Sequence, residues 1–252
     1  MRSLSRSSRS RCTTRPVGLS AVMRCRNEEE YVGASILSIY RIFDEIVVVL
    51  NNSTDRTRKL IEDLLPDHPK VRLLEYSNEC SPVGPGYYES VLAKPESSLA
   101  KYYNWCLEQT SFSHVCKWDG DMIATPVFEQ VRTLIKSSDV VVFDGYDVLG
   151  ERTTDFEPRI FKYDPARARY VDWDLYEVLE HNYAKVSCVP EKCYLHMKLV
   201  KKEWINQRWS NPNLLAARSV PENGSSAASK SLLKAWVRRI AHGLWRQSIG
   251  RA

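Results

Sequence analysis

The chain has 252 residues, of which 43% are hydrophobic, enough to build the core of one catalytic domain with short appendages. Its net charge of +5 comes from the two ends: residues 1–16 and 230–252 carry eleven basic residues and no acidic ones, which leaves 25 basic against 31 acidic residues between them, a net charge of −6. A negatively charged core argues against nucleic-acid binding, because nucleic-acid-binding domains concentrate Lys and Arg on their folded part.

Strand-like and helix-like segments alternate along the chain after the basic start. Strands are predicted at residues 17–24, 46–50, 71–76, in the run that enters Asp119, and at 140–143, with helices at 29–42, 55–65, 98–109 and 127–136. This order predicts an α/β fold with a mostly parallel central sheet flanked by helices. Ligands of such sheets bind beyond the carboxyl ends of the strands, so we expect the loops after Arg24, Leu50 and Trp118 to face one crevice.

Two carboxylates stand one residue apart where a short apolar run ends, in Asp119-Gly120-Asp121. Side chains alternate along a strand, so Asp119 and Asp121 are expected on the same side, and Gly120 would let a ligand approach the backbone. Carboxylate oxygens are preferred by Mg²⁺ and Mn²⁺, which keep coordination positions open for nucleotide phosphates. The motif predicts a divalent metal site, although the same three residues also occur in solvated turns.

Three motifs in this order carry a family resemblance. Residues 22–29 contain Asn27-Glu28-Glu29, residues 44–55 end in Ser53-Thr54-Asp55, and the Asp-Gly-Asp motif follows a helix that contains Lys101 and Asn104. This pattern resembles the family 2 glycosyltransferases, with a Lys three positions before Asn104 where the family has an Arg-Asn helix.

The resemblance implies a GT-A fold, a nucleotide-sugar donor, a divalent metal on its diphosphate, and inverting transfer to an acceptor hydroxyl. It implies donor-binding roles for Arg24, Asn27, Glu28, Asn51, Asp55, Lys101, Asn104 and Arg159. Plainer roles remain open: Asp55 could cap a helix, Glu28 could be a first-turn acid, and Lys101 and Arg159 could form surface ion pairs. The family usually has an Asp where this chain has Leu50, which leaves the nucleotide base undetermined.

Further along, the chain resembles the branch of the family that builds lipopolysaccharide cores and cell-surface polysaccharides. Residues 159–161 match its Arg-Leu-Phe element, Tyr176-Glu177 matches its His-Glu element, and His196 matches a late His that implies a third metal ligand, unless it only packs in the core. Inversion needs a carboxylate base. Glu177 is one candidate; Asp172 and Asp174 are the others, because they resemble the Glu-Asp-Trp-Asp element of other members.

Two other function classes remain open. A nucleotidyltransferase that acts on sugar phosphates also uses metal-binding acids, but it would normally carry a Gly-rich phosphate loop after the first strand, and residues 24–27 contain no Gly. A non-catalytic glycan-binding relative would need neither Asp119 nor Asp121. The preferred hypothesis is therefore a glycosyltransferase that acts on a glycan or lipid-linked acceptor.

The predicted domains are a disordered basic tail at 1–16, the GT-A domain at 17–216, a linker at 217–230 and a basic amphipathic helix at 231–252. The helix has an apolar face beside basic residues, which is typical of a helix that lies on an anionic membrane, although it could also dock on the core. No apolar run is long enough to span a bilayer and no apolar leader is evident. We expect a cytoplasmic protein that associates peripherally with the inner face of the membrane, with its seven cysteines reduced.

Overall fold

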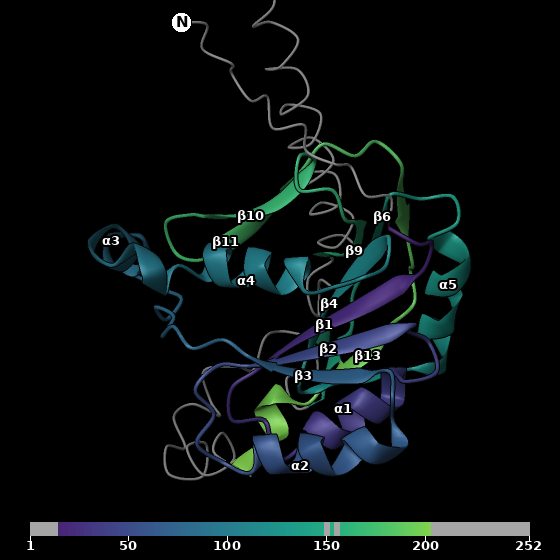
Figure 1. Cartoon of the computed structure of the whole chain (residues 1–252). Helices are drawn as coiled ribbons and strands as arrows, with labels where there is room; N and C mark the ends of the chain where they lie inside the picture. Colours follow the sequence, from purple (N-terminus) through teal and green to yellow (C-terminus); the bar gives the residue numbers. More distant parts are fainter. Residues whose placement is uncertain (1–14, 149–151, 154–156, 203–252) are drawn as a thin grey trace, which may run out of the picture. The chain divides into compact units, whose positions relative to one another are not determined.

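A mostly parallel sheet of seven strands forms the centre of the described part of the chain (Figure 1). The structure is a computed structural model that describes residues 15–148, 152–153 and 157–202. The predicted linker and the predicted helix at 231–252 lie outside the described residues, as do residues 1–14 of the predicted tail. The predicted mostly parallel α/β fold is confirmed.

The strands of this sheet lie in the order β12-β6-β9-β4-β1-β2-β3. They cover β1 Leu19–Cys25, β2 Glu45–Leu50, β3 Val71–Glu75, β4 His114–Asp119, β6 Val140–Phe143, β9 Glu157–Lys162 and β12 Val186–Cys188. Strands β3, β2, β1 and β4 run parallel to one another, and so do β12 and β6. Strand β9 is antiparallel to both of its neighbours and joins the two groups.

Helices follow the strands where the apolar periodicity predicts them, with shorter ends. They cover α1 Val32–Ile39, α2 Thr57–Leu64, α3 Tyr87–Ala93, α4 Leu99–Glu108 and α5 Val131–Leu134, with 3₁₀ turns at η1 Leu65–Asp67, η2 Pro95–Ser97, η3 Pro126–Gln130 and η4 Lys198–Val200. The predicted helix at 127–136 is therefore only partly right, because its first half is the 3₁₀ turn η3. Helix α3 directly follows the Pro- and Gly-rich residues 81–86, in a stretch where no helix was predicted.

Two smaller sheets complete the described structure. One is the hairpin of β10 Ala168–Asp172 and β11 Glu177–His181, and the other has the order β5-β13-β7-β8, with β5 Met122–Ala124, β13 Tyr194–His196, β7 Tyr146–Asp147 and β8 Arg152–Thr153. In Figure 1 the hairpin lies against α4, and the contacts between α4 and β10 agree. The short sheet brings the late segment of β13 beside β5, directly after the Asp-Gly-Asp motif.

Alternating residues of the central strands pack on opposite faces of the sheet. On one face, alternate residues of β1 and β2 join α1 in one apolar core: Leu19, Ala21, Met23, Ile46, Val48, Leu50, Val32, Ile36 and Ile39. On the other face lies α4, where the Tyr102 hydroxyl donates to the carbonyl of Val49 at 3.3 Å. Strands β1 and β2 are buried almost throughout, as expected for parallel strands covered on both faces.

A tight contact at Gly145 gives a test of this core. A Cβ atom placed on Gly145 would lie 2.4 Å from the ring of Tyr194, which is only 1% exposed and has little room to move. We expect Gly145→Ala to lower the free energy of unfolding by about 2 kcal/mol, as overpacking usually does.

Gly33 supplies the matched control, because it lies inside α1 and nothing stands within 4 Å of its added Cβ. Gly33→Ala should stabilise the protein by about 0.5–1 kcal/mol through the helix propensity of Ala. Urea unfolding monitored by circular dichroism measures both changes. Equal midpoints for Gly145→Ala and the wild type would show that Tyr194 can move aside.

Candidate active site

Arg24 and Asp119 face each other at the carboxyl ends of two neighbouring parallel strands. The register of β1 and β4 pairs their Cα positions, and Nη2 of Arg24 lies 3.5 Å from Oδ1 of Asp119. Arg159, from the antiparallel strand β9, approaches the other oxygen, with Nη1 at 3.2 Å from Oδ2. Both guanidinium side chains are at least nine-tenths buried. One carboxylate therefore lies between two arginines at the edge of the sheet where the sequence predicted the site.

The electrostatics of Asp119 follow from these neighbours. Burial raises the pKa of its carboxyl group, but the charges of Arg159, Lys117 and Arg24 outweigh burial and hold the pKa well below its usual range. The Arg24 guanidinium also lies 3.2 Å from the centroid of the Tyr103 ring, which fixes its plane. Asp119 is thus ionised throughout the physiological range.

The two arginines keep unused donors. Nη1 of Arg24 and Nε of Arg159 are buried atoms without a hydrogen-bond partner in the described structure. Buried donors usually have a partner, and guanidinium N–H groups that lack one can hydrogen-bond to an anionic ligand. The pair thus provides N–H groups of the kind that bind phosphate oxygens.

Asp121 belongs to a second group of charges. Its Oδ1 lies 3.5 Å from Nε2 of His196, and its Oδ2 lies 2.7 Å from Nζ of Lys201. Nδ1 of His196 lies 2.8 Å from Oδ1 of Asp147, which orients the ring. Burial raises the pKa of Asp121, but the hydrogen bond from His196 and the charge of Lys201 bring it below its usual value. The predicted metal-site residues Asp121 and His196 therefore lie together.

Glu28 fills the space over Gly120, between the two aspartates. A Cβ atom on Gly120 would lie 2.9 Å from Cγ of Glu28 and 3.1 Å from Sγ of Cys25, so only Gly allows this approach. The close neighbour of Gly120 is thus a side chain of the protein, where the sequence suggested a ligand. Burial is the main cause that raises the pKa of Glu28 to about 7, and the negative charge of Asp121 adds to it. The positive charge of Lys201 opposes both effects.

The donor set around Asp121 fits a divalent cation. Among the described residues, no three His, Cys, Asp or Glu side chains form a ready-made metal cluster. Nevertheless, Asp121 and His196 present an oxygen and a nitrogen to each other, and Asp147 holds His196 through its other nitrogen, as carboxylates do behind metal-binding histidines. Mg²⁺ typically takes one or two carboxylates and fills its other positions with water and phosphate oxygens.

Three of the predicted donor-binding residues connect the loops after β1, β2 and β3. Oδ1 of Asn27 accepts from the backbone N–H of Thr54 at 2.8 Å, and the amide of Asn51 donates to two carbonyls beyond β3. The carboxylate of Asp55 accepts from the backbone N–H groups of Thr57 and Glu29, each at 3.0 Å. In this structure the three side chains shape the loops; the N-cap of α2 is Arg56, and Asp55 lies one residue before it.

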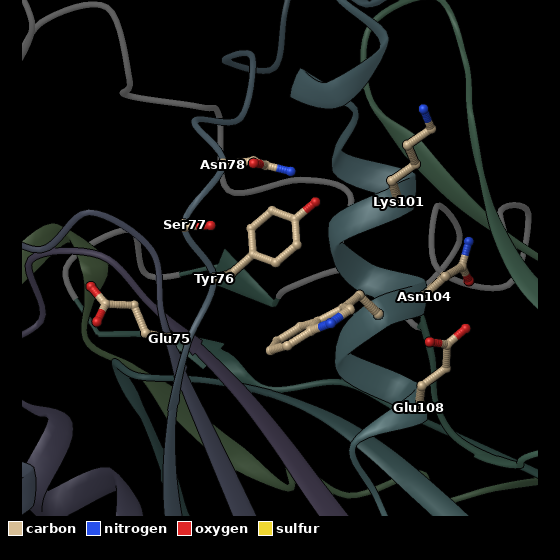
Figure 2. Close-up of a pocket in the computed structure, with 8 residues that line it drawn as sticks. Glu75, Tyr76, Ser77, Asn78, Lys101, Asn104 and Glu108 are labelled. Atoms are coloured by element: carbon tan, nitrogen blue, oxygen red, sulfur yellow. The ribbon is translucent and has the colours of Figure 1, made fainter.

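Lys101 and Asn104 lie on another side of α4 from the Asp119 group. Together with Trp105 and Glu108 they line a pocket of about 560 Å³ that residues 75–78 close from the β3 side (Figure 2). At 100° per residue, this face is roughly opposite Tyr103, the residue that touches Arg24. Both polar atoms of Asn104 also bond the backbone of Tyr170 in β10, at 2.9 Å each. The structure therefore does not bring these two residues to Asp119.

The three candidate bases have different surroundings. Asp172 accepts hydrogen bonds from Ser98 Oγ at 2.6 Å, from the backbone N–H of Ala100 at 3.1 Å, and from the Tyr87 hydroxyl. Asp174 is exposed at the tip of the hairpin. Glu177 is half-buried at the start of β11, where burial raises its pKa against the charges of Lys117 and Arg24. Of the three, Glu177 is the carboxylate that shares electrostatic neighbours with Asp119.

Four residues near the site were not identified from the sequence: Tyr103, Lys117, Asp147 and Lys201. Asp147 and Lys201 have no motif around them, whereas Tyr103 and Lys117 stand beside motif residues but are of types that the motifs do not specify. The one available signal was the spacing on α4, which separates Tyr103 from Lys101 and Asn104 by helical phase.

Comparison with known proteins supports this architecture. Residues 20–79 match the family model described as Glycosyl transferase family 2. The crystal structure of S. aureus TarS 1-349 superposes with a TM-score of 0.51 at 15% identity, over 84% of this chain and 68% of the TarS chain. The chain has a GT-A fold. This likeness establishes the fold alone, because the identity is low.

Two further solved structures are similar over about half of the chain. One is the mannosyltransferase PcManGT from Pyrobaculum calidifontis in complex with GDP-Man and Mn²⁺, with 19% identity, 54% of this chain and 36% of that chain covered, and a TM-score of 0.39. The other is glucosyl-3-phosphoglycerate synthase from Mycobacterium tuberculosis in complex with Mn²⁺, UDP and glucosyl-3-phosphoglycerate. It is 22% identical, the match covers 51% of this chain and 43% of that chain, and the TM-score is 0.35. A search of curated protein sequences gave no match.

The surroundings of Asp172 predict a structural role. Its carboxylate accepts from the first turn of α4, Ser98 Oγ accepts from the N–H of Lys101, and the Tyr87 oxygen accepts from the N–H of Leu99. Asp172→Ala should lower the free energy of unfolding by about 2 kcal/mol, since it removes charge-assisted bonds at a helix N-terminus. Asp174→Ala, an exposed control on the same hairpin, should change it by less than about 0.5 kcal/mol. Chemical denaturation that shows equal losses for the two variants would contradict this role.

Proposed function

We propose that the protein is a metal-dependent, inverting family 2 glycosyltransferase. It moves a sugar from a nucleotide-sugar donor to a hydroxyl of a glycan or lipid-linked acceptor, in the synthesis of a surface polysaccharide or lipopolysaccharide. The observation that carries the proposal is the pair of buried guanidiniums, Arg24 and Arg159, around Asp119 at the carboxyl ends of the strands. The match of residues 20–79 to the glycosyltransferase family and the GT-A fold support it.

The donor side of the reaction uses the cationic groups. The spare N–H donors of Arg24 and Arg159 bind the diphosphate, and their fixed positions stabilise the negative charge that it gains as the sugar leaves. Asp121 and His196 would hold the metal, with Asp119 as the third side chain of the predicted set. When bound, Mg²⁺ or Mn²⁺ would supply Lewis-acid stabilisation of the leaving diphosphate. The locked loops after β1 and β2 form the wall against which the nucleoside rests.

The acceptor side uses Glu177 as general base. Asp172 is occupied by three donors at the start of α4, and Asp174 lies exposed at the hairpin tip, so Glu177 is the carboxylate available beside Arg24 and Lys117. Its pKa is raised by burial, which makes it a stronger base than a solvated carboxylate when it takes the acceptor proton. The acceptor hydroxyl then attacks the anomeric carbon opposite the diphosphate, which inverts its configuration.

Replacement of Glu177 tests this assignment. Glu177→Gln keeps the shape of the side chain but cannot accept a proton, so the turnover of donor should fall about a hundredfold while nucleotide affinity is kept. Turnover is measured as hydrolysis of a panel of UDP- and GDP-sugars with Mn²⁺, and affinity by calorimetric titration with UDP and GDP.

Glu180→Gln is the matched control, because Glu180 lies exposed on the same strand, and it should keep wild-type turnover. Full activity of Glu177→Gln together with inactivity of Asp174→Asn would show that the base lies in the other sequence element. If no nucleotide sugar binds or turns over with the wild type, the glycosyltransferase proposal itself is wrong.

Peripheral membrane association belongs to the same proposal. No helix in the described ranges is a candidate for a membrane span. Residues 231–252, which carry the predicted basic amphipathic helix, lie outside the described residues, and their sequence places Trp236 and Trp245 among basic residues without any acid. Each Lys or Arg near an anionic leaflet contributes roughly 1 kcal/mol of attraction.

A truncated variant that ends at Ser229 tests the membrane proposal. The full chain should cosediment with vesicles that contain anionic lipid, the truncated variant should remain in the supernatant, and added salt should weaken binding of the full chain. Vesicles of neutral lipid serve as the control. Equal sedimentation of the two proteins would reject an anchor in residues 230–252.

A further inference from the structure

Lys201 lies between two acidic side chains from different parts of the chain. Its Nζ atom is 2.7 Å from Oε2 of Glu28 and 2.7 Å from Oδ2 of Asp121. The side chains of Lys201, Glu28 and Asp121 are only 14%, 15% and 7% exposed, respectively. An ammonium group thus occupies the place where the two carboxylates would otherwise repel each other.

A short segment carries Lys201 into this place, and we call residues 197–202 the strap. The backbone N–H of Met197 donates to the carbonyl of Asp121 at 2.8 Å, and the N–H of Lys202 donates to the carboxylate of Glu30 at 3.0 Å. The hydroxyl of Tyr31 donates to the carbonyl of Val200 at 3.4 Å. Among the described residues these bonds hold the backbone of the strap, and one of them is made by the backbone of Asp121 itself.

Lys201 and a divalent ion need the same carboxylate. Oδ1 of Asp121 faces His196 and Oδ2 faces Lys201, so a metal held by Asp121 and His196 would stand close to the ammonium group. Positive charges a few ångströms apart in a partly buried site repel strongly, because water screens them poorly there. The two cations therefore exclude each other.

We propose that Lys201 is an internal cation, which fills the position between Glu28 and Asp121 in the metal-free protein and withdraws with the strap when a divalent ion binds. This inference rests on the metal site of the proposed function. Metal binding and release of the strap are then thermodynamically linked. Release of the strap raises the metal affinity by the same factor by which bound metal favours release of the strap. Lys201 thereby sets the metal concentration at which the site fills.

Removal of the Lys201 charge should tighten metal binding. Mn²⁺ alone is titrated into the full chain, and free Mn²⁺ is measured by electron paramagnetic resonance. Lys201→Met keeps the length of the side chain without its charge and should bind Mn²⁺ about tenfold more tightly, or about 1.4 kcal/mol. Lys201→Arg, which keeps the charge, should bind Mn²⁺ no more tightly than the wild type.

Lys202→Met is the matched control, because Lys202 is the next residue of the strap, is exposed, and contacts Glu30 through its backbone. It should keep wild-type Mn²⁺ affinity. If Lys201 had only a structural role in the ion pair, the opposite would be expected: loss of Lys201 would displace Asp121 and weaken Mn²⁺ binding. Equal or weaker Mn²⁺ binding by folded Lys201→Met would therefore overturn the proposal.

Hydrogen exchange of the wild type gives a second readout, which needs no variant. Saturating Mn²⁺ should speed the exchange of the backbone amides in the strap, those of Met197 and Lys202 above all, since their bonds break when the strap withdraws. Unchanged exchange in a protein that has bound Mn²⁺ would show that Lys201 stays in place. The inference about Lys201 would then be wrong, while the proposed metal site would stand. If the wild type and Lys201→Met both bind no Mn²⁺, the metal site of the proposed function fails as well.

Discussion

The parallel register of β1 with β4 sets the chemistry of the site, because it buries Arg24 beside Asp119. A buried guanidinium without a carboxylate would be strongly destabilising, and a buried carboxylate without a cation equally so. Arg159 adds a second positive charge from β9. The same constraint extends to Asp121, whose partners His196 and Lys201 come from the end of the described chain. The order and register of the strands thus determine which charged side chains are paired in the site.

Charge in this site is close to balanced without any ligand. Acidic groups at Glu28, Asp119, Asp121, Asp147 and Glu157 stand against the cations Arg24, Lys117, Arg159 and Lys201 and the imidazole of His196. A nucleotide diphosphate-sugar is a dianion, so its arrival together with a divalent metal adds no net charge. Either one alone would unbalance a poorly screened environment. The proposed function therefore predicts that donor and metal would bind more tightly together than either would alone.

Local sequence predicted the strands of the first half of the fold but missed helix α3 and most of the strand pairings of the second half. Apolar runs such as Ile46 to Leu50 predict buried parallel strands, and loops at their carboxyl ends follow from topology alone. The antiparallel strand β9 and the four-stranded sheet depend on pairings between distant segments, which periodicity does not reveal. For the same reason the sequence named Asp121 and His196 as site residues but missed Lys201, whose position depends on the course of the strap. Asp172 and Glu177 could be separated only after the start of α4 was seen.

The position of β9 also bears on how the molecule assembles. Strands β3, β2, β1 and β4 come from residues 19–119 and can pair as soon as that stretch exists, whereas β6 and β12 reach them only through β9. Contacts between distant segments form slowly, because a long loop must close, at a cost in conformational entropy, before these contacts can stabilise the chain. Arg159 lies on this joining strand. A chain emerging from the ribosome would thus present the loops after β1 and β2 before it gains its second guanidinium, so the pair of arginines around Asp119 is completed only when the two parts of the sheet unite.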